Sequence, residues 1–261
     1  MSNPEEEKLW RASDAGLLST VRSIMENHPS VDVNWKSASY EHTALHDACM
    51  NGHAHVVAYL LTHPAINVNA TDIWGGTPLT IAVQFGKVGC VRLLLKDSRV
   101  TNINQAYFDG HTPLKYASAN GHILAIKWLI ASGLPLDTGK PGDDKSDAVQ
   151  AAKNRRNSII TTLLEYFREN PEGATHDARV ELGFHDEMAS QVFASVIFVS
   201  DGLLHLKATD NRGARFFTIA SRLPLELQMV LCFRVVGSAK EVILVKDSEV
   251  AFKDLARLFP K

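Results

Sequence analysis

Gly76-Thr77-Pro78-Leu79-Thr80-Ile81-Ala82 is the segment that decides the fold, because the same pattern occurs again on both sides of it. Residues 42–48 (HTALHDA) and residues 111–117 (HTPLKYA) repeat it at distances of about 34 residues. In each copy a Gly follows four residues after the last Ala, and an apolar stretch comes next. Self-similarity at this period predicts a solenoid of stacked helix pairs, in which each unit buries its apolar face against its neighbours.

The repeated positions predict the core of this solenoid. One apolar position recurs every 34 to 36 residues, at Leu9, Leu45, Leu79, Leu114 and, in the last unit, Ala148. A small residue follows three places later in every unit, at Ala12, Ala48, Ala82, Ala117 and Ala151. We expect the Leu side chains to fill the space between units and the Ala residues to let the helices approach closely.

These segments closely resemble the ankyrin-repeat family, whose units read T-P-L-H-x-A-A before a Gly-His turn and a second apolar helix. The resemblance covers about residues 6–168 and implies three internal units between two atypical end units. It also implies a β-hairpin between units, where residues 33–34, 68–69 and 103–104 match the family's V-N segment. We therefore predict a mainly α fold, with an ankyrin-repeat domain over residues 6–170.

The sequence departs from the family pattern at a few positions. Thr80 and Lys115 replace the His at the start of the first helix, which among the internal units only His46 retains. The last unit, residues 146–168, has Arg155 and Arg156 in place of the Gly. Polar residues there suit an end unit whose outer side faces water or another domain.

The resemblance further implies that the hairpin tips and the first helices form a concave face that binds partners. Mapping by register puts twelve residues on this face: Tyr40, His42, Met50, Asn51, Ile73, Trp74, Gln84, Phe85, Phe108, Asp109, His111 and Asn120. Large aromatic residues at solvated positions are typical of binding anchors, since Trp and Tyr often dominate binding energy. The alternative is that Trp74 and Phe108 fold back onto the adjacent hairpin and have only a structural role.

The repeat pattern stops after residue 173, and we predict a small α+β extension over residues 176–261. Residues 191–199 and 203–207 indicate two strands about a tight turn. Helices are expected over residues 211–221, over residues 225–236 and from about residue 247.

Residues 223–258 are similar to an F-box, beginning with the L-P-x-E segment at residues 223–226. This similarity implies docking to the linker subunit of a cullin-type ubiquitin ligase, with the repeats selecting the substrate. The same four residues are also a common helix start, because Pro suits the first turn and Glu complements the helix dipole. A substrate receptor is therefore the alternative to a simple adaptor.

Other chemistry has little support in the sequence. Residues 133–140 do not form a phosphate-binding loop, since Pro141 stands where Ser or Thr is required. Zinc needs four converging ligands, and the nearest candidates are repeat positions (His46, Cys49, His53 and His55). There is no G-x-S-x-G or H-E-x-x-H motif. We expect no catalytic residue, cofactor or metal; catalysis by Asp201, His205 and Asp210 is the third alternative.

Composition predicts the kind of partner and the compartment. A net charge of −2 argues against nucleic-acid binding, which requires a surplus of Lys and Arg. The apolar stretches are too short to cross a bilayer, and the acidic start differs from a secretory signal. Three cysteines indicate a reducing compartment. We predict a non-enzymatic adaptor that binds another protein in the cytoplasm, with the nucleus as the alternative.

Overall fold

The structure, a computed structural model, describes residues 4–143 and 145–200 together with a few isolated positions, namely Ala220, Gln228, Met229, Leu231, Cys232 and Ala251. The chain divides into two compact units, residues 1–178 and residues 179–261. The predicted domain limits at residues 170 and 176 stay predictions, because a division by packing does not mark where a repeat ends.

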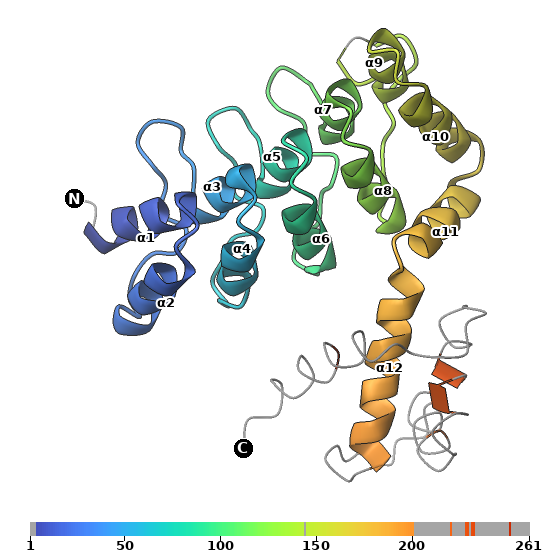
Figure 1. Cartoon of the computed structure of the whole chain (residues 1–261). Coiled ribbons are helices and arrows are strands. Elements are labelled where there is room, and N and C mark those ends of the chain that lie inside the picture. Colours follow the sequence, from blue (N-terminus) through green and yellow to red (C-terminus); the bar gives the residue numbers. More distant parts are fainter. Residues whose placement is uncertain are drawn as a thin grey trace. The chain divides into compact units, whose positions relative to one another are not determined.

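Helix pairs follow one another along the first unit (Figure 1). In the described residues they are α1 (Pro4–Asp14) with α2 (Leu18–Asn27), α3 (Ala44–Asn51) with α4 (Ala54–Leu61), α5 (Pro78–Gln84) with α6 (Val88–Lys96), α7 (Pro113–Asn120) with α8 (Ile123–Ala131), and α9 (Ala148–Asn154) with α10 (Ser158–Glu169). Successive first helices pack on each other, and so do α2, α4, α6 and α8. The loops between pairs lie along one edge (Figure 1). The predicted mainly α solenoid is confirmed.

Thr residues determine where the first helices begin. The Thr77 hydroxyl accepts a hydrogen bond from the amide of Thr80, and Thr112 does the same for Lys115. Pro78 and Pro113 then occupy the first helical position, where a missing N–H costs nothing. In α3 the cap is reciprocal, because the Thr43 amide also donates to Nδ1 of His46. The T-P signature of the repeats is thus a helix-start signal.

The Gly after each first helix is required by backbone conformation and by space. Gly16 and Gly86 have φ of +72° and +63°, in the left-handed region that disfavours side chains. A Cβ on Gly86 would lie 2.5 Å from Nδ1 of His122 in the next unit, and one on Gly16 would lie 2.6 Å from Nδ1 of His53. The turn is therefore fixed by packing between units as well as by local geometry.

The last unit differs from the predicted register by one residue. Helix α9 begins at Ala148 after the cap Asp147, as α5 begins at Pro78 after Thr77. Val149, not Ala148, consequently occupies the position of Leu79. The spacing of 34 residues was misleading because the loop before α9 has a different length, and helix caps rather than sequence period set the register.

The core follows the repeated apolar positions. Leu45, Leu79 and Leu114 are fully buried, and so are the Ala residues three places after them. Each Leu lies on a first helix that packs against the first helices on either side, so the three side chains form successive layers of one interior. Burying such a side chain stabilises the fold by about 2 kcal/mol.

The loops between units carry the predicted apolar-Asn segment but no regular strand among the described residues. Val33, Val68 and Ile103 are buried beneath the loops. The Asn34 side chain donates to the carbonyl of Ala65 and accepts from the amide of Asn67. The β-hairpin implied by the family resemblance is therefore reduced to a single backbone bond that closes each tip, between residues 37 and 42, 72 and 76, and 107 and 111. Side-chain amides replace the longer ladder.

Two further helices follow, α11 (Pro171–Glu181) and α12 (Phe184–Ser200). Helix α12 contradicts the strand predicted over residues 191–199. Ala189, Phe193 and Val196 are buried together, at the spacing of one helix face, in a small core with Ala220 and Cys232. Burial on that face outweighs the β-propensity of the Val-rich sequence.

The remaining predictions for the extension fall outside the described residues, apart from isolated positions. These are the strand over residues 203–207, the later helices, the F-box-like segment and the candidate residues Asp201, His205 and Asp210. No described residue is in a strand, so the α+β character of the extension is not supported.

Candidate functional site

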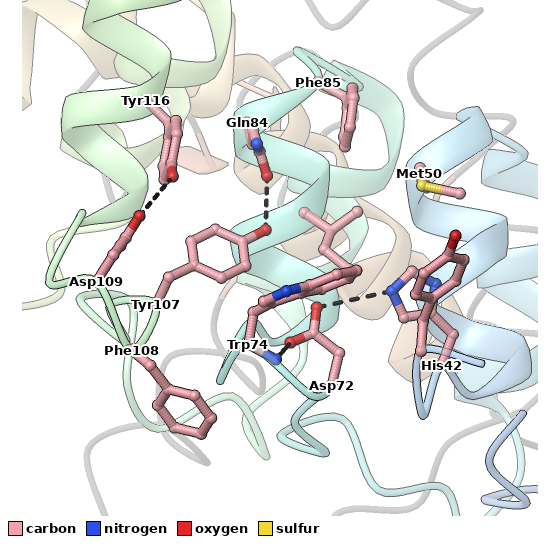
Figure 2. Close-up of a pocket in the computed structure, with 12 residues that line it drawn as sticks. His42, Met50, Asp72, Trp74, Gln84, Phe85, Tyr107, Phe108, Asp109 and Tyr116 are labelled. Atoms are coloured by element: carbon pink, nitrogen blue, oxygen red, sulfur yellow. Dashed lines mark hydrogen bonds and ion pairs between the residues drawn. The ribbon is translucent and has the colours of Figure 1, made fainter. Parts of the chain in front are cut away.

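A half-open groove of about 440 Å³ lies over the first helices and loop tips of the three internal units (Figure 2). The tips contribute Tyr40, His42, Asp72, Trp74, Tyr107, Phe108 and Asp109, and the first helices and their ends contribute Met50, Ile81, Gln84, Phe85 and Tyr116. Eight of the twelve residues predicted for the binding face line this groove. Asn51, Ile73, His111 and Asn120 do not.

The three tips are joined into one row. The Ile73 amide donates to the carbonyl of Tyr40 at 3.1 Å, and the Phe108 amide donates to the carbonyl of Trp74 at 2.7 Å. Tyr40 and Trp74 hold equivalent tip positions, since each precedes a residue with positive φ. Their rings stack with centroids 5.3 Å apart and planes at 28°. The row of tips therefore carries a preformed aromatic surface.

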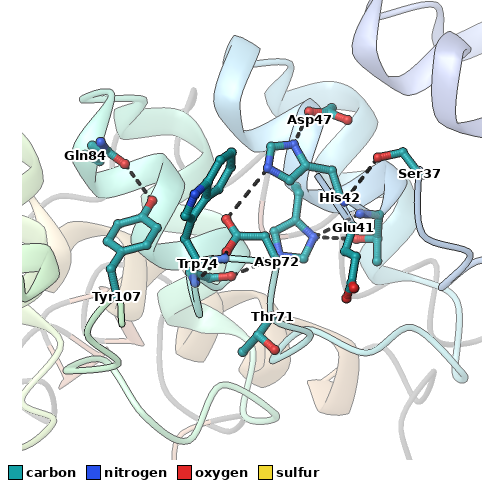
Figure 3. Close-up of polar contacts among 12 residues, drawn as sticks. Ser37, Glu41, His42, Asp47, Thr71, Asp72, Trp74, Gln84 and Tyr107 are labelled. Carbon is teal, nitrogen blue, oxygen red and sulfur yellow. Dashed lines mark hydrogen bonds and ion pairs between the residues drawn. The ribbon is translucent and has the colours of Figure 1, made fainter. Parts of the chain in front are cut away.

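Asp72 fixes the tip that bears Trp74. Its Oδ1 accepts hydrogen bonds from the amides of Trp74 and Gly76, both at 2.8 Å (Figure 3). Burial alone would raise the pKa of Asp72, but contacts with His42 and with the two backbone amides lower it below its usual value. Asp72 is therefore an ionised, buried group that shapes the loop and also lines the groove.

His42 lies below the aromatic surface and is only 5% exposed, so the prediction that it faces solvent is wrong. Its Nδ1 is 2.7 Å from Oδ1 of Asp47, and its Nε2 is 3.7 Å from Oδ2 of Asp72 (Figure 3). Burial acts to lower the pKa of His42, but the two carboxylates raise it to about 9. The physical result is a protonated imidazole held between two acidic groups beneath Trp74.

His46 is the opposite case and stays neutral. Burial, followed by the positive charge of His42, lowers its pKa to about 4. Its Nδ1 is bonded to Thr43 and its Nε2 lies 3.3 Å from the carbonyl of Gly76. The nearby His53 and His55 also bond backbone carbonyls, at Asp14 and Gly16. These imidazoles tie units together, and the described residues include no His, Cys, Asp and Glu cluster arranged for a metal.

The fourth unit supplies a second pair of rings. Tyr107 and Tyr116 meet edge to face with centroids 5.4 Å apart, and the Tyr107 hydroxyl donates to Oε1 of Gln84 at 2.6 Å. Burial and then the negative charge of Asp72 raise the pKa of Tyr107, so this hydroxyl remains a donor. Asp109, beside them, is half-exposed and accepts from the Tyr116 hydroxyl.

Both readings of the exposed aromatic residues hold in part. Trp74 leans on Tyr40, and the Phe108 ring lies against Gly75, where a Cβ would come within 2.9 Å of it. Even so, Trp74 remains 46% exposed and Phe108 80% exposed. The rings are thus supported by the adjacent tips while a large apolar area stays open to solvent.

Some predicted residues have structural tasks instead. The Asn51 amide donates to the carbonyl of Asp14, and that of Asn120 donates to the carbonyl of Gln84, each across a unit boundary. Four groove residues were missed: Asp72, Ile81, Tyr107 and Tyr116. Tyr107 could have been found, because its place in the third tip corresponds to that of Asp72 in the second. Nothing in the sequence around Tyr116 indicates that its ring reaches the tip.

No described helix combines the length and the apolar character needed to cross a membrane. A family model of ankyrin repeats in three copies matches residues 9–105 and 65–140.

The chain is also similar to several curated proteins. The human "SMC5-SMC6 complex localization factor protein 1" is 31% identical over 200 residues, which is 69% of this chain and 19% of that protein. The "E3 ubiquitin-protein ligase XBAT33" of Arabidopsis thaliana is 33% identical over 170 residues, 62% of this chain and 32% of that protein. The "Putative ankyrin repeat protein YahD" of Escherichia coli (strain K12) is 37% identical over 91 residues, 33% of this chain and 44% of that protein.

This chain accordingly spans less than half the length of each of these relatives. The family is established by the repeated helix starts, the glycine turns, the layered core and the matching family model. The chain belongs to the ankyrin-repeat family.

Proposed function

We propose that this chain is a non-enzymatic adaptor that binds another protein through the groove over its three internal repeats. The proposal rests on one observation: large rings from successive tips stand open to solvent on backbone that is already hydrogen-bonded in place. Ordering costs on binding would be small for such a surface. Ankyrin repeats as a family bind other proteins, which supports the same conclusion.

The test is affinity capture with the purified full chain. We expect the double variant Tyr40→Ala/Trp74→Ala to lose bound partner, with an affinity lower by about 30-fold or more, because exposed Trp and Tyr anchors commonly contribute at least 2 kcal/mol. Ile159→Ala is the matched control, since Ile159 is a comparably exposed apolar residue on α10, outside the groove. Equal capture by all three proteins would remove the proposal.

Stability is measured on the same samples. The ring stack contributes about 1 kcal/mol beyond its buried area, so the double variant should melt only slightly below the parent. A large fall in melting temperature would mean that the two rings hold the loops together instead of serving a partner.

A second candidate is a substrate receptor of a ubiquitin ligase, as the F-box-like segment over residues 223–258 suggests. The printed name of XBAT33 gives it limited support, because that name states ligase activity for a protein that this chain covers by 32%. Pull-down of the cullin linker subunit by the full chain decides between the two. Retention that is lost in Leu223→Ala/Pro224→Ala favours the receptor, and no retention leaves the adaptor.

The compartment follows the same comparison. The sequence predicts the cytoplasm with the nucleus as the alternative, and the human relative is named for localising a complex of SMC proteins. We propose a cytoplasmic or nuclear site of action, to be tested by fractionation of cells that express the tagged chain.

A further inference from the structure

The charge in and under the groove is negative. The described lining includes the carboxylates of Asp72 and Asp109 but no Lys or Arg. His42 is the one cationic group there, and its two ring nitrogens face Asp47 and Asp72 instead of the opening. An anionic ligand would therefore meet repulsion and find no cationic donor. A cation would be attracted.

The rings favour a cation as well. The faces of Trp and Tyr carry partial negative charge and attract ammonium or guanidinium groups within about 6 Å. The chain already uses this contact elsewhere, where Arg22 lies 5.0 Å from the ring centroid of Tyr59 and Arg92 lies 6.0 Å from that of Trp128. In the groove the rings of Trp74, Tyr107 and Tyr116 line the opening together (Figure 2). No such cation is present in the described lining.

The rest of the groove suits an aliphatic stem. Met50, Ile81 and Phe85 provide an apolar wall next to the rings. Lys and Arg side chains bury their methylene stems along apolar surface while their charged ends remain near polar groups. A volume of about 440 Å³ has room for one such side chain together with part of the backbone that carries it.

We propose that the groove receives a lysine or arginine side chain from an extended segment of the partner protein. The stem lies on the apolar wall, and the cation meets the ring faces of Trp74 and the tyrosines near Asp109. This inference rests on the proposed adaptor function and specifies the chemistry that the partner must offer.

The probe is a phage-displayed library of random 12-residue peptides, selected on the immobilised full chain. We expect the enriched peptides to share a Lys or Arg, and its replacement by norleucine in synthetic copies to weaken binding about tenfold or more, measured by fluorescence anisotropy. Raising the salt concentration should weaken the parent peptide and leave the norleucine peptide nearly unchanged. Enriched peptides without a basic residue, or equal affinity of the norleucine copies, would overturn the inference.

Three variants separate a cation site from a merely apolar one. Trp74→Leu keeps apolar bulk but removes the ring face, so the preference for the basic peptide over its norleucine copy should nearly vanish. Trp74→Phe keeps a ring and should retain most of that preference. Asp109→Asn should reduce it about threefold, the size expected of one half-exposed charge. A preference that stays the same in all three would contradict a cation site in this groove.

Failure of this inference is distinguishable from failure of the adaptor function. If no peptide is enriched, or only peptides without basic residues, the basic-segment inference is overturned. The adaptor function is then judged separately by capture of intact proteins with the Tyr40→Ala/Trp74→Ala variant and its Ile159→Ala control.

Discussion

At the scale of single residues, two neighbouring histidines are held in opposite charge states, and this difference has a measurable effect. His42 is protonated between Asp47 and Asp72, with its pKa raised to about 9, and His46 is neutral, with its pKa lowered to about 4. Protonated His42 stabilises the fold fully below its unfolded pKa of about 6.5, and this stability is lost as the pH rises through about 9. Neutral His46 stabilises the fold above about 6.5, and this is lost as the pH falls towards 4.

We therefore expect the free energy of unfolding, measured by urea titration, to be greatest near pH 6.5 and to fall by on the order of 2 kcal/mol by pH 9.5. This is a discounted linkage value, because water at the mouth of the groove screens the charges. His42→Asn should remove most of the alkaline decrease, although the variant will be less stable at every pH because two buried carboxylates lose their partner. The same alkaline slope in both proteins would show that His42 is not protonated in the folded state.

The groove was only partly predictable from single residues. Tyr40, Trp74 and Phe108 were found because a large ring at a loop tip is conspicuous in the sequence. His42 was placed on the wrong side because the group that covers it, Asp72, comes from the next unit, 30 residues along the chain. Tyr116 was missed for the same kind of reason, since its neighbours in the groove are set by packing between units.

At the scale of secondary-structure elements, the turn between the two helices of a unit depends on a contact with the next unit. We expect Gly86→Ala to destabilise the fold by about 2–3 kcal/mol, measured by urea titration, because the new Cβ would collide with the His122 ring and the backbone has φ of +63°. Gly142→Ala is the matched control. It has φ of +80° with nothing within 4 Å of the added Cβ, so only the backbone cost of about 1 kcal/mol remains.

A double-mutant cycle isolates the collision. His122→Ala should recover most of the difference between Gly86→Ala and Gly142→Ala, because it removes the ring that the Cβ would strike. Equal destabilisation by the two glycine substitutions, with no recovery in the double variant, would mean that left-handed backbone alone explains the glycine.

Elements with their own local signals were predicted well, and elements without them were not. Helices α5 and α7 begin at Thr-Pro pairs, whose capping is readable from sequence. Helix α9 lacks that pair and begins after Asp147, so extrapolating the period placed it one residue off. Helix α12 was taken for a strand because its Val-rich second half suits both structures, and burial around Phe193, a tertiary effect, decides between them.

At the scale of the whole repeat unit, the groove is a product of the array. No single repeat contains it, since the tips of three consecutive units are linked by the backbone bonds from Ile73 to Tyr40 and from Phe108 to Trp74. The order of the array therefore sets the order of the binding surface, and loosening one internal unit should weaken binding as well as stability. This explains why the groove lies over the internal units, which have repeat neighbours on both sides.

The same linear arrangement predicts how stability is distributed. Leu79→Ala removes a buried side chain from the central unit, costs about 2–5 kcal/mol and breaks the coupling in both directions, so hydrogen-exchange protection should fall from α3 through α8. Val149→Ala, at the equivalent position of the last unit, should cost about 2 kcal/mol and lower protection mainly in α9 and α10, because an end unit can open alone. Hydrogen exchange followed by mass spectrometry on both variants checks this. If Val149→Ala lowers protection in α3 and α4 as much as in α9 and α10, the array opens as one cooperative block, and coupling reaches beyond neighbouring units.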